Sequence, residues 1–334
     1  MADFNQLLKV LRREAPDRDV LYDLFLNDAL YKSACGDKYD VSTGRAVMLT
    51  QIRGFNYYGY DYASVRGSEY WFHVKPQKHA RTVSLNDAGI IGDRKSFDEY
   101  NFMDPHKCDY SLLKDIEPDL PKGMKLIPVA PGGVLENVIR LVGYDNLCFM
   151  LYDDRQLVCD LFEKIGEGLN GYYQNCCRHN AVGALMVNDD WGFNTQTMLS
   201  LSDMRGLVFP WHKKIVETIH GFGKPALLHS CGNYDSIVDD LFTLGYDARH
   251  SYEDNIEPVE KAYERFRGRI AVLGGIDMDF MARSTPGQIK ERCKNMLKLG
   301  RKYGGYALGT GNSVPEYIPM ENYLAMLDST DIKR

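Results

Sequence analysis

The sequence predicts an α/β protein that folds as a single (β/α)8 TIM barrel with an amino-terminal helical segment and an inserted β-hairpin. From Lys125 onward one order recurs: a short apolar run, a turn rich in Gly, Asn or Asp, then an amphipathic helix pattern. This alternation is typical of a parallel sheet. The length of 334 residues suits one elaborated barrel, and no linker separates two cores, so residues 1–334 are expected to form one domain.

Eight apolar runs are the predicted strands, which is the number that closes such a barrel. They lie at residues 20–25, 60–65, 125–129, 182–187, 225–228, 246–249, 269–273 and 305–308. Helices are expected at residues 155–174, 202–222, 236–244, 258–266 and 285–303, with glycines closing four of them at Gly223, Gly245, Gly268 and Gly304. Residues 1–18 are expected to hold the amino-terminal helix. Residues 69–92 alternate polar and apolar side chains about a turn, which predicts the hairpin.

Composition excludes several classes of protein. The 40 basic and 46 acidic residues give a net charge of -6, so the chain has no basic footprint for nucleic acid or for an anionic membrane. No apolar run reaches 18 residues, and the first residues lack the apolar segment of a signal peptide. The eight cysteines are few and irregularly spaced. We expect reduced cysteines, a cytoplasmic location, no membrane and no nucleic-acid partner.

Polar residues follow five consecutive predicted strands. The active site of a (β/α)8 barrel forms at the carboxyl ends of its strands, so these segments are expected to meet at one place. They are NDDWG (188–192), HSCGN (229–233), HSYED (250–254), GGID (274–277) and GTGNS (309–313). The glycines of the last two segments match no dinucleotide or Walker pattern, which argues against nucleotide binding.

His229 and Cys231 are the best metal-ligand candidates. They are two residues apart, so both side chains leave the same face of an extended strand end, and imidazole with thiolate suits Zn²⁺. A zinc site needs at least one more protein ligand. The spacing also fits a buried histidine beside a free cysteine that bind no metal, and both interpretations are kept here. Candidates for the third ligand are Glu253, Asp189 and His250, with Asp190 and Asp277 less favoured.

Other residues of these loops have expected roles. Asp189, Asp190 and Asp277 are candidates to orient substrate or accept protons, although each could instead cap a turn or helix. Four further residues are expected to contact a cofactor. They are Trp191, Asn233, Tyr252 and Thr310.

Several longer strings resemble the uroporphyrinogen decarboxylase superfamily over residues 20 to 328. They are VAPGGVLENVIRLVGYDNL, NDDWGFNTQ, DMRGLVFPW, LHSCGN, LGGID, and GGYALGTGN followed by Pro319-Met320-Glu321-Asn322. The resemblance implies a (β/α)8 barrel. It also implies one of two chemistries: the decarboxylase of haem synthesis, or a zinc- and corrinoid-dependent methyltransferase that moves methyl groups between cobalamin and thiols or other substrates.

The methyltransferase branch is the nearer resemblance. LHSCGN is similar to its zinc motif, which implies His229 and Cys231 as ligands. Where that branch carries a second cysteine near the last strand, this chain has Asn312, so the third ligand would be Glu253, Asp189 or another oxygen donor. Asn312 is then expected to hydrogen-bond the substrate. The implied reaction is methyl transfer between a small methyl donor or acceptor and a corrinoid protein, or a thiol, with zinc assistance.

The decarboxylase branch fits less well. Its amino-terminal arginine motif is replaced by DVLYDLFLND, and its last-strand histidine by Thr310. A polyanionic porphyrinogen needs cationic partners, whereas Asp23 and four other acids are predicted near the barrel mouth. Decarboxylation of porphyrinogen or of a smaller acid remains the alternative function. A non-catalytic protein that binds a corrinoid or another small molecule is the second alternative.

Overall fold

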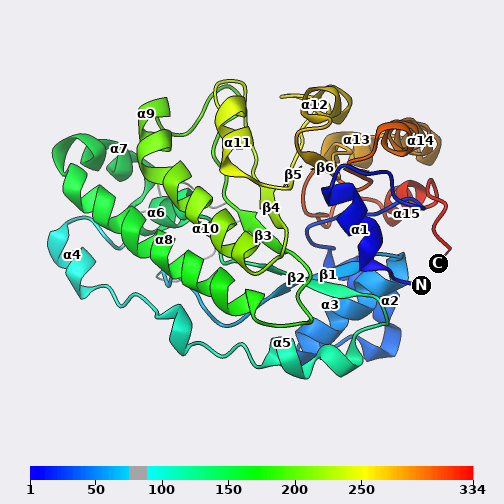
Figure 1. Cartoon of the computed structure of the whole chain (residues 1–334), viewed down its shortest axis with the longest axis horizontal. Helices are drawn as coiled ribbons and strands as arrows, with labels where there is room; N and C mark the ends of the chain where they lie inside the picture. The colour runs from blue at the N-terminus through cyan, green and yellow to red at the C-terminus, as the bar shows by residue number, and fades with distance from the viewer. Residues whose placement is uncertain (75–88, 334) are drawn as a thin grey trace.

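A computed structural model describes residues 1–74 and 89–333 of the chain and contains one seven-stranded parallel sheet whose order follows the sequence (Figure 1). Every neighbouring pair of strands is parallel. The strands are β1 (Tyr62–Arg66), β2 (Lys125–Val129), β3 (Leu185–Asn188), β4 (Ala226–His229), β5 (Ala248–His250), β6 (Ala271–Leu273) and β7 (Tyr306–Ala307). The predicted alternation of strands and helices is therefore confirmed from residue 60 onward.

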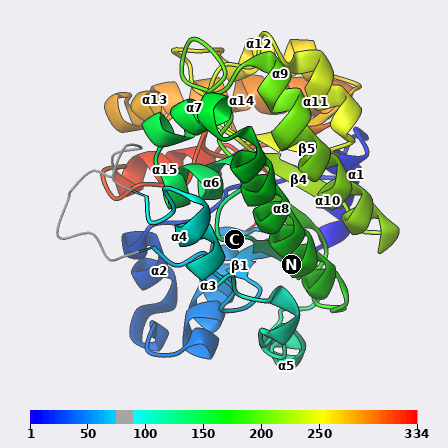
Figure 2. The same ribbon diagram turned by 90° about the vertical axis from the view of Figure 1, so that its left-hand side faces the viewer.

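Helices surround this sheet, and α8, α10 and α11 lie along the side that faces the viewer in Figure 1. Figure 2 shows α12, α13 and α14 together along the top of the view. The α-helices are α1 (Phe4–Leu11), α2 (Asp28–Cys35), α3 (Gly44–Tyr58), α4 (Arg94–Glu99), α5 (Leu112–Asp115), α6 (Val134–Val142), α7 (Tyr144–Asp153), α8 (Arg155–Cys177), α9 (Leu201–Asp203), α10 (Phe209–Gly221), α11 (Val238–Leu244), α12 (Val259–Phe266), α13 (Met278–Arg283), α14 (Pro286–Tyr303) and α15 (Met320–Leu327).

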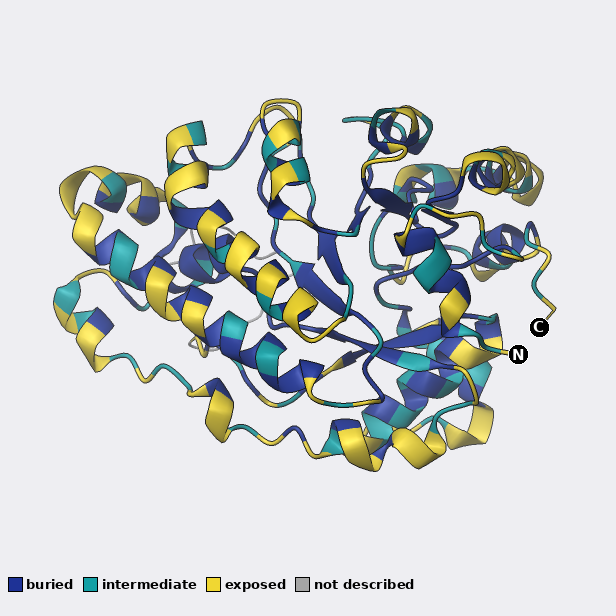
Figure 3. Ribbon diagram, in the orientation of Figure 1, coloured by how far each residue is buried: buried dark blue, intermediate teal, exposed yellow. Residues whose placement is uncertain are grey.

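The strands are almost wholly buried, as Figure 3 shows by their dark colour. In β4 all four residues are buried, and in β2 only Lys125 is partly accessible. Each strand of a parallel sheet that is covered on both faces has a continuous apolar sequence rather than an alternating one. For this reason these strands could be recognised from short apolar runs.

The eighth predicted strand, residues 20–25, is present only as an isolated bridge. Leu21 pairs in parallel with Leu308, beside β7. Toward β1 the described residues show no backbone pairing. There the hydroxyl of Tyr62, rather than a strand backbone, bonds the backbone of Asp23. It accepts from the N–H of Asp23 at 2.8 Å and donates to the carbonyl of Asp23 at 2.6 Å. The structure therefore shows a curled parallel sheet, and full closure into an eight-stranded barrel is not shown.

The predicted helix ends are largely confirmed. Gly223, Gly245, Gly268 and Gly304 all have positive φ angles, between 70° and 88°, a conformation that glycine adopts without strain. The helix predicted at 202–222 is interrupted by a π-helical turn at Met204–Val208, which the periodicity alone did not indicate.

Two expectations concern the amino-terminal third. The predicted amino-terminal helix is present as α1, which begins after its cap Asp3. The predicted hairpin at residues 69–92 lies mostly at 75–88, outside the described residues, and the described flanks contain no strand. In the described parts of the chain, no helix is both long enough and apolar enough to cross a membrane.

Candidate metal centre and adjoining cavity

Three side chains at the carboxyl ends of β3 and β4 bring possible ligand atoms together. The ligand atoms of Asp190, His229 and Cys231 all lie within 4.8 Å of one another. The Nε2 atom of His229 lies 3.9 Å from the Sγ atom of Cys231, and the backbone N–H of Cys231 donates to Asp190 at 2.8 Å. The expected pairing of His229 with Cys231 is thus present. The third member is Asp190, one of the two acids that the sequence favoured least.

A chain of hydrogen bonds fixes the tautomer of His229. The Nε2 atom of His250 lies 3.1 Å from the carbonyl oxygen of Thr310, which can only accept, so His250 carries its proton on Nε2. The Nδ1 atom of neutral His250 must then accept from Nδ1 of His229, 2.7 Å away. Burial lowers the pKa of His229 to about 4 and lowers that of His250 well below its ordinary value, which keeps both rings neutral. Nε2 of His229 is therefore unprotonated, and its lone pair faces the thiol of Cys231, 3.9 Å away.

The thiol of Cys231 has two polar neighbours besides the histidine. Asn312 donates from Nδ2 at 3.3 Å, and its amide is oriented by the N–H of Ser313, which donates to Oδ1 at 2.7 Å. The hydroxyl of Ser251 lies 3.3 Å from the sulfur. Burial, with the Asp190 carboxylate, raises the pKa of Cys231 to about 12, so the free side chain is a thiol. A nearby cation would be needed to hold it as the thiolate.

Two expected ligands are engaged elsewhere. Both ring nitrogens of His250 are used in its hydrogen bonds to His229 and to the carbonyl of Thr310. Asp189 is fully buried and accepts from the N–H groups of Leu135 and Glu136 at the start of α6, and it pairs with Nε2 of His212 at 2.8 Å. Asp189 therefore caps a helix, the alternative that the sequence had left open for it.

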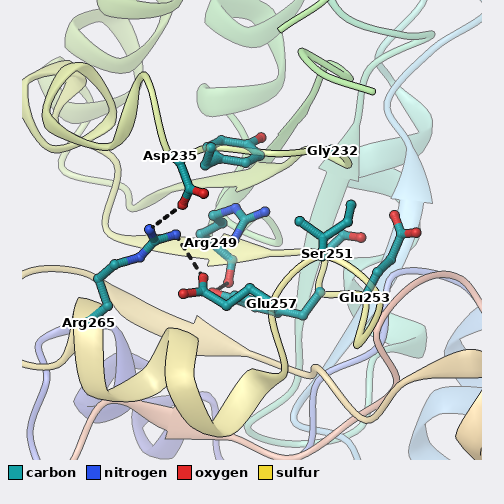
Figure 4. Close-up of a pocket in the computed structure, with 10 residues that line it drawn as sticks. Gly232, Asp235, Arg249, Ser251, Glu253, Glu257 and Arg265 are labelled. Carbon is teal, nitrogen blue, oxygen red and sulfur yellow. Dashed lines mark hydrogen bonds and ion pairs between the residues drawn. The ribbon is translucent and has the colours of Figure 1, made fainter. Parts of the chain in front are cut away.

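Asp277 and Glu253 lie outside the cluster of ligand atoms. Asp277 caps α13 by accepting from Phe280, and it also accepts from the N–H of Asp254. Glu253 follows β5 and lines a small pocket with Ser251 and with an ion-paired arginine, Arg265 (Figure 4). The expected metal role of Glu253 is thus not supported by a close approach to Cys231 or His229.

The four expected cofactor contacts pack against or hydrogen-bond other residues of the chain, and Nε1 of Trp191 is buried without a hydrogen-bond partner. Trp191 is fully buried against Phe209 and His212. Asn233 accepts from the N–H of Asp235 in a turn, and the hydroxyl of buried Tyr252 donates to the carbonyl of its near neighbour in β5. Thr310 donates from its N–H to Asp23 and offers its carbonyl to His250. Of the four, only Thr310 is linked to a metal candidate by hydrogen bonds, through His250 to His229.

A cavity of about 230 Å³ opens beside His229. Polar side chains line it from the ends of β1 and β3 and from α6, and Leu24, Phe25, Val129, Ala130 and Pro131 form its apolar wall. Besides His229, the polar members are Arg66, Glu136, Arg140 and Asn188, and both arginines contact the ring of Trp71. Asn188 is the first residue of the segment NDDWG that was expected at the site, and Trp71 lies in the predicted hairpin, whereas Arg66, Glu136 and Arg140 were not expected there. Glu136 and Arg140 follow a predicted strand and stand four residues apart, a signal that could have placed both on one face of a helix at the barrel mouth.

Glu136 is the strongly perturbed acid of this cavity. It accepts from the N–H of Gly133 at 2.8 Å and from Nδ2 of Asn188 at 3.2 Å. Burial, followed by the negative charges of Asp189 and Asp190, raises the pKa of Glu136 to about 8. The carboxyl group is therefore mostly protonated at neutral pH and can donate a proton.

Comparison with solved structures gives a match along almost the whole chain. A methyltransferase from Methanosarcina mazei superposes with a TM-score of 0.70 at 15% identity and covers 97% of this chain and 96% of its own. At that identity the likeness shows the fold. Xylanase B from Clostridium stercorarium F9 matches with a TM-score of 0.42 at 10% identity, over 86% of this chain and 93% of its own. No curated protein sequence matches the chain significantly.

The family comparison rests on sequence. The model of the uroporphyrinogen decarboxylase (URO-D) family matches residues 110–331, about two thirds of the chain. This range contains β2 to β7, the three clustered ligand candidates and Glu136. The chain belongs to the uroporphyrinogen decarboxylase (URO-D) family.

Proposed function

We propose that the protein is a methyltransferase that moves a methyl group between a small substrate and a corrinoid protein, or a thiol, with a zinc ion held by Asp190, His229 and Cys231. The observation that carries this proposal is the approach of three ligand atoms to within 4.8 Å of one another, beside a cavity. The likeness in fold to a methyltransferase is consistent with it.

The donor set fits zinc. Nitrogen and sulfur ligands about 2.0 Å and 2.3 Å from zinc, at a tetrahedral angle, lie about 3.5 Å apart, close to the 3.9 Å between His229 Nε2 and Cys231 Sγ. The Nε2 lone pair of His229 is free for a metal, and its other nitrogen is held by a second residue, as in most metal-binding histidines. Three protein ligands leave a fourth position open, which is typical of catalytic zinc sites.

The roles of this chain's residues follow from the geometry. A bound zinc ion would act as a Lewis acid on the heteroatom that carries the methyl group. When the methyl group leaves, the bonding electron pair stays on that heteroatom, which then takes up a proton. Glu136 lines the cavity in its protonated form and is the proposed proton donor. Asn312 and Ser251 stabilise the sulfur of Cys231 by hydrogen bonding.

Metal analysis tests the proposal directly. Freshly purified protein should contain about one zinc ion per chain, and Cys231→Ser should lose it, whereas Cys159→Ser, a matched change in α8, should not. Anomalous scattering at the zinc edge should place the ion at Cys231. Zinc-free protein that also fails to take up added zinc would overturn the metal part. The reaction is followed by the visible spectrum of free cob(I)alamin as it is methylated by candidate methyl donors. Metal-loaded protein that accelerates none of them would count against methyl transfer.

Decarboxylation of a small acid is the second candidate, and the two arginines in the cavity favour it. At about 230 Å³ the cavity is smaller than the range of about 300–1,000 Å³ for drug-sized ligands, so it suits a small acid better than a tetrapyrrole. Release of carbon dioxide from small carboxylic acids, without methylation of cobalamin, would favour this reaction over methyl transfer.

A further inference from the structure

Two arginines in the cavity beside His229 have no charged partner. Neither Arg66 nor Arg140 makes an ion pair or a hydrogen bond with any residue that the structure describes, and Nη1 of Arg140 is buried without a partner. Other arginines of the chain, such as Arg292 and Arg301, do pair with carboxylates. A buried guanidinium nitrogen without an acceptor costs free energy, and residues 1–74 and 89–333 supply none here, so a bound ligand is a fitting acceptor.

Both guanidinium groups lie over one aromatic ring. Arg66 is 4.5 Å and Arg140 is 5.2 Å from the centre of the Trp71 ring. Arg66 is accessible to solvent as a whole, but partial desolvation of its guanidinium group, with the charge of Arg140, lowers its pKa. Two like charges held near one indole repel each other, and an anion between them would relieve the repulsion. Contact with the ring also limits where the two planar groups can lie, and a guanidinium group binds a planar, two-oxygen acceptor through two of its N–H groups.

The nearest acid of the cavity does not neutralise the arginines. Glu136 is mostly uncharged at neutral pH for the reasons given above, so the cavity has a net positive charge even though the whole chain is acidic. The buried Oδ1 atom of Asn188 also lacks a partner. Beside it the cavity presents the apolar side chains of Phe25 and Val129. The site thus offers cations, one hydrogen-bond acceptor and an apolar wall.

We infer that this cavity binds a small organic acid, with its carboxylate held by Arg66 and Arg140 and its apolar body against Phe25 and Val129. The inference rests on the proposed function in one respect: it takes this acid to be the substrate or the product of the proposed methyl transfer. A bidentate arginine contact to a carboxylate is a strong, charge-assisted hydrogen bond. The cavity volume of about 230 Å³ limits the body to a small group, such as one ring.

Calorimetric titration with benzoate, propionate and benzamide tests the inference. Benzoate or propionate should bind one site per chain, and benzoate should bind at least tenfold more tightly than benzamide, which has the same ring without the charge. Arg66→Gln and Arg140→Gln should each weaken binding about tenfold to a hundredfold. Arg205→Gln is the matched control, because Arg205 pairs with Asp240 on the surface away from the cavity, and it should bind as wild type.

Three results would overturn the inference: equal binding of benzoate and benzamide, unchanged binding by both cavity variants, or no binding of either acid at millimolar concentration. Inorganic phosphate that binds more tightly than both acids through the same arginines would overturn the assignment of a carboxylate. Circular dichroism checks the fold of each variant, and Arg140→Lys, which keeps the charge, should retain part of the binding and so supports the test if Arg140→Gln does not fold.

The same titrations separate this inference from the proposed function. They are performed on chelator-treated protein, on zinc-loaded protein and on Cys231→Ser. If the wild type fails to take up added zinc but binds the acid through the arginines, the inference is retained and the metal mechanism is removed. Zinc uptake without binding of any acid would retain the metal part of the proposed function and overturn the inference.

Discussion

The Nδ1 atoms of His229 and His250 lie 2.7 Å apart, so one imidazole donates to the other. The two residues are paired in register across β4 and β5, and the far side of His250 is held by the carbonyl of Thr310. A ligand histidine is usually oriented by a carboxylate or a backbone carbonyl. Here the carbonyl acts through a second histidine, which makes His250 a positioning residue for the proposed metal centre.

Replacing this second histidine should weaken zinc binding. We expect His250→Gln to lower the affinity for zinc by about tenfold to a hundredfold, the usual effect of losing an orienting partner. Competition with a chromophoric zinc chelator measures the affinity. His220→Gln, a change at an accessible histidine paired with Asp247, is the control and should have the wild-type affinity. An unchanged affinity in His250→Gln would show that His229 does not depend on the chain of hydrogen bonds.

Two carboxylates compete as the third ligand, and their variants should differ. Asp190→Asn should weaken zinc binding by more than about tenfold, because an amide is a poorer zinc ligand than a carboxylate. Glu253→Gln should change the affinity less than about twofold, because Glu253 lies outside the cluster of ligand atoms. The same chelator competition decides between them. The opposite order would restore Glu253 as the ligand that the sequence favoured.

The raised pKa of Glu136 predicts how stability depends on pH. Between its ordinary pKa of 4.5 and about 8, the folded protein keeps a proton on Glu136 that the unfolded chain has lost. The folded state binds more protons, so the free energy of unfolding should fall as pH rises through this range, by about 1–3 kcal/mol. Urea unfolding of chelator-treated wild type and Glu136→Gln at several pH values measures it. The variant should lack this part of the decline, and parallel pH profiles would refute the shift.

Asp189 should matter for stability. Asp189→Ala removes the cap of α6 and leaves His212 without its buried partner, so we expect a loss of about 2–4 kcal/mol in the free energy of unfolding. Urea unfolding measures the loss. Asp239→Asn, at an exposed position in the first turn of α11, should change stability by no more than about 0.5 kcal/mol. Near-wild-type stability of Asp189→Ala would instead favour the catalytic role that the sequence suggested.

The sequence was sufficient for the order of elements and for part of the site. Because each strand of a parallel sheet ends at the same edge, the residues after the apolar runs led directly to His229, Cys231 and Asn312. It could not rank Asp190 above Glu253, since that depends on the path of two loops and on the hydrogen bond from the N–H of Cys231.

The capping role of Asp189 was also beyond the sequence. It requires α6 to begin directly against the end of β3, where an added Cβ on Gly133 would lie 2.1 Å from the side chain of Asp189. Arg66 and Trp71 could not be placed for a different reason. Arg66 is the last residue of β1 and lies just past the predicted strand at 60–65, and Trp71 lies in the predicted hairpin, so their positions at the cavity could be found only in three dimensions.

The bond between Tyr62 and Asp23 has a consequence for local stability. Between residues 20–25 and β1 the described residues form no backbone ladder, and the hydroxyls of Tyr62 and Tyr60 hold Asp23 instead, so opening this junction breaks fewer backbone hydrogen bonds than separating a ladder of several residues. In the order of strands, β4 and β5 are the pair farthest from this junction. His229 and His250 therefore lie where the curled sheet continues on both sides, and fluctuations that begin at the junction must cross three or more strands before they disturb the proposed ligands.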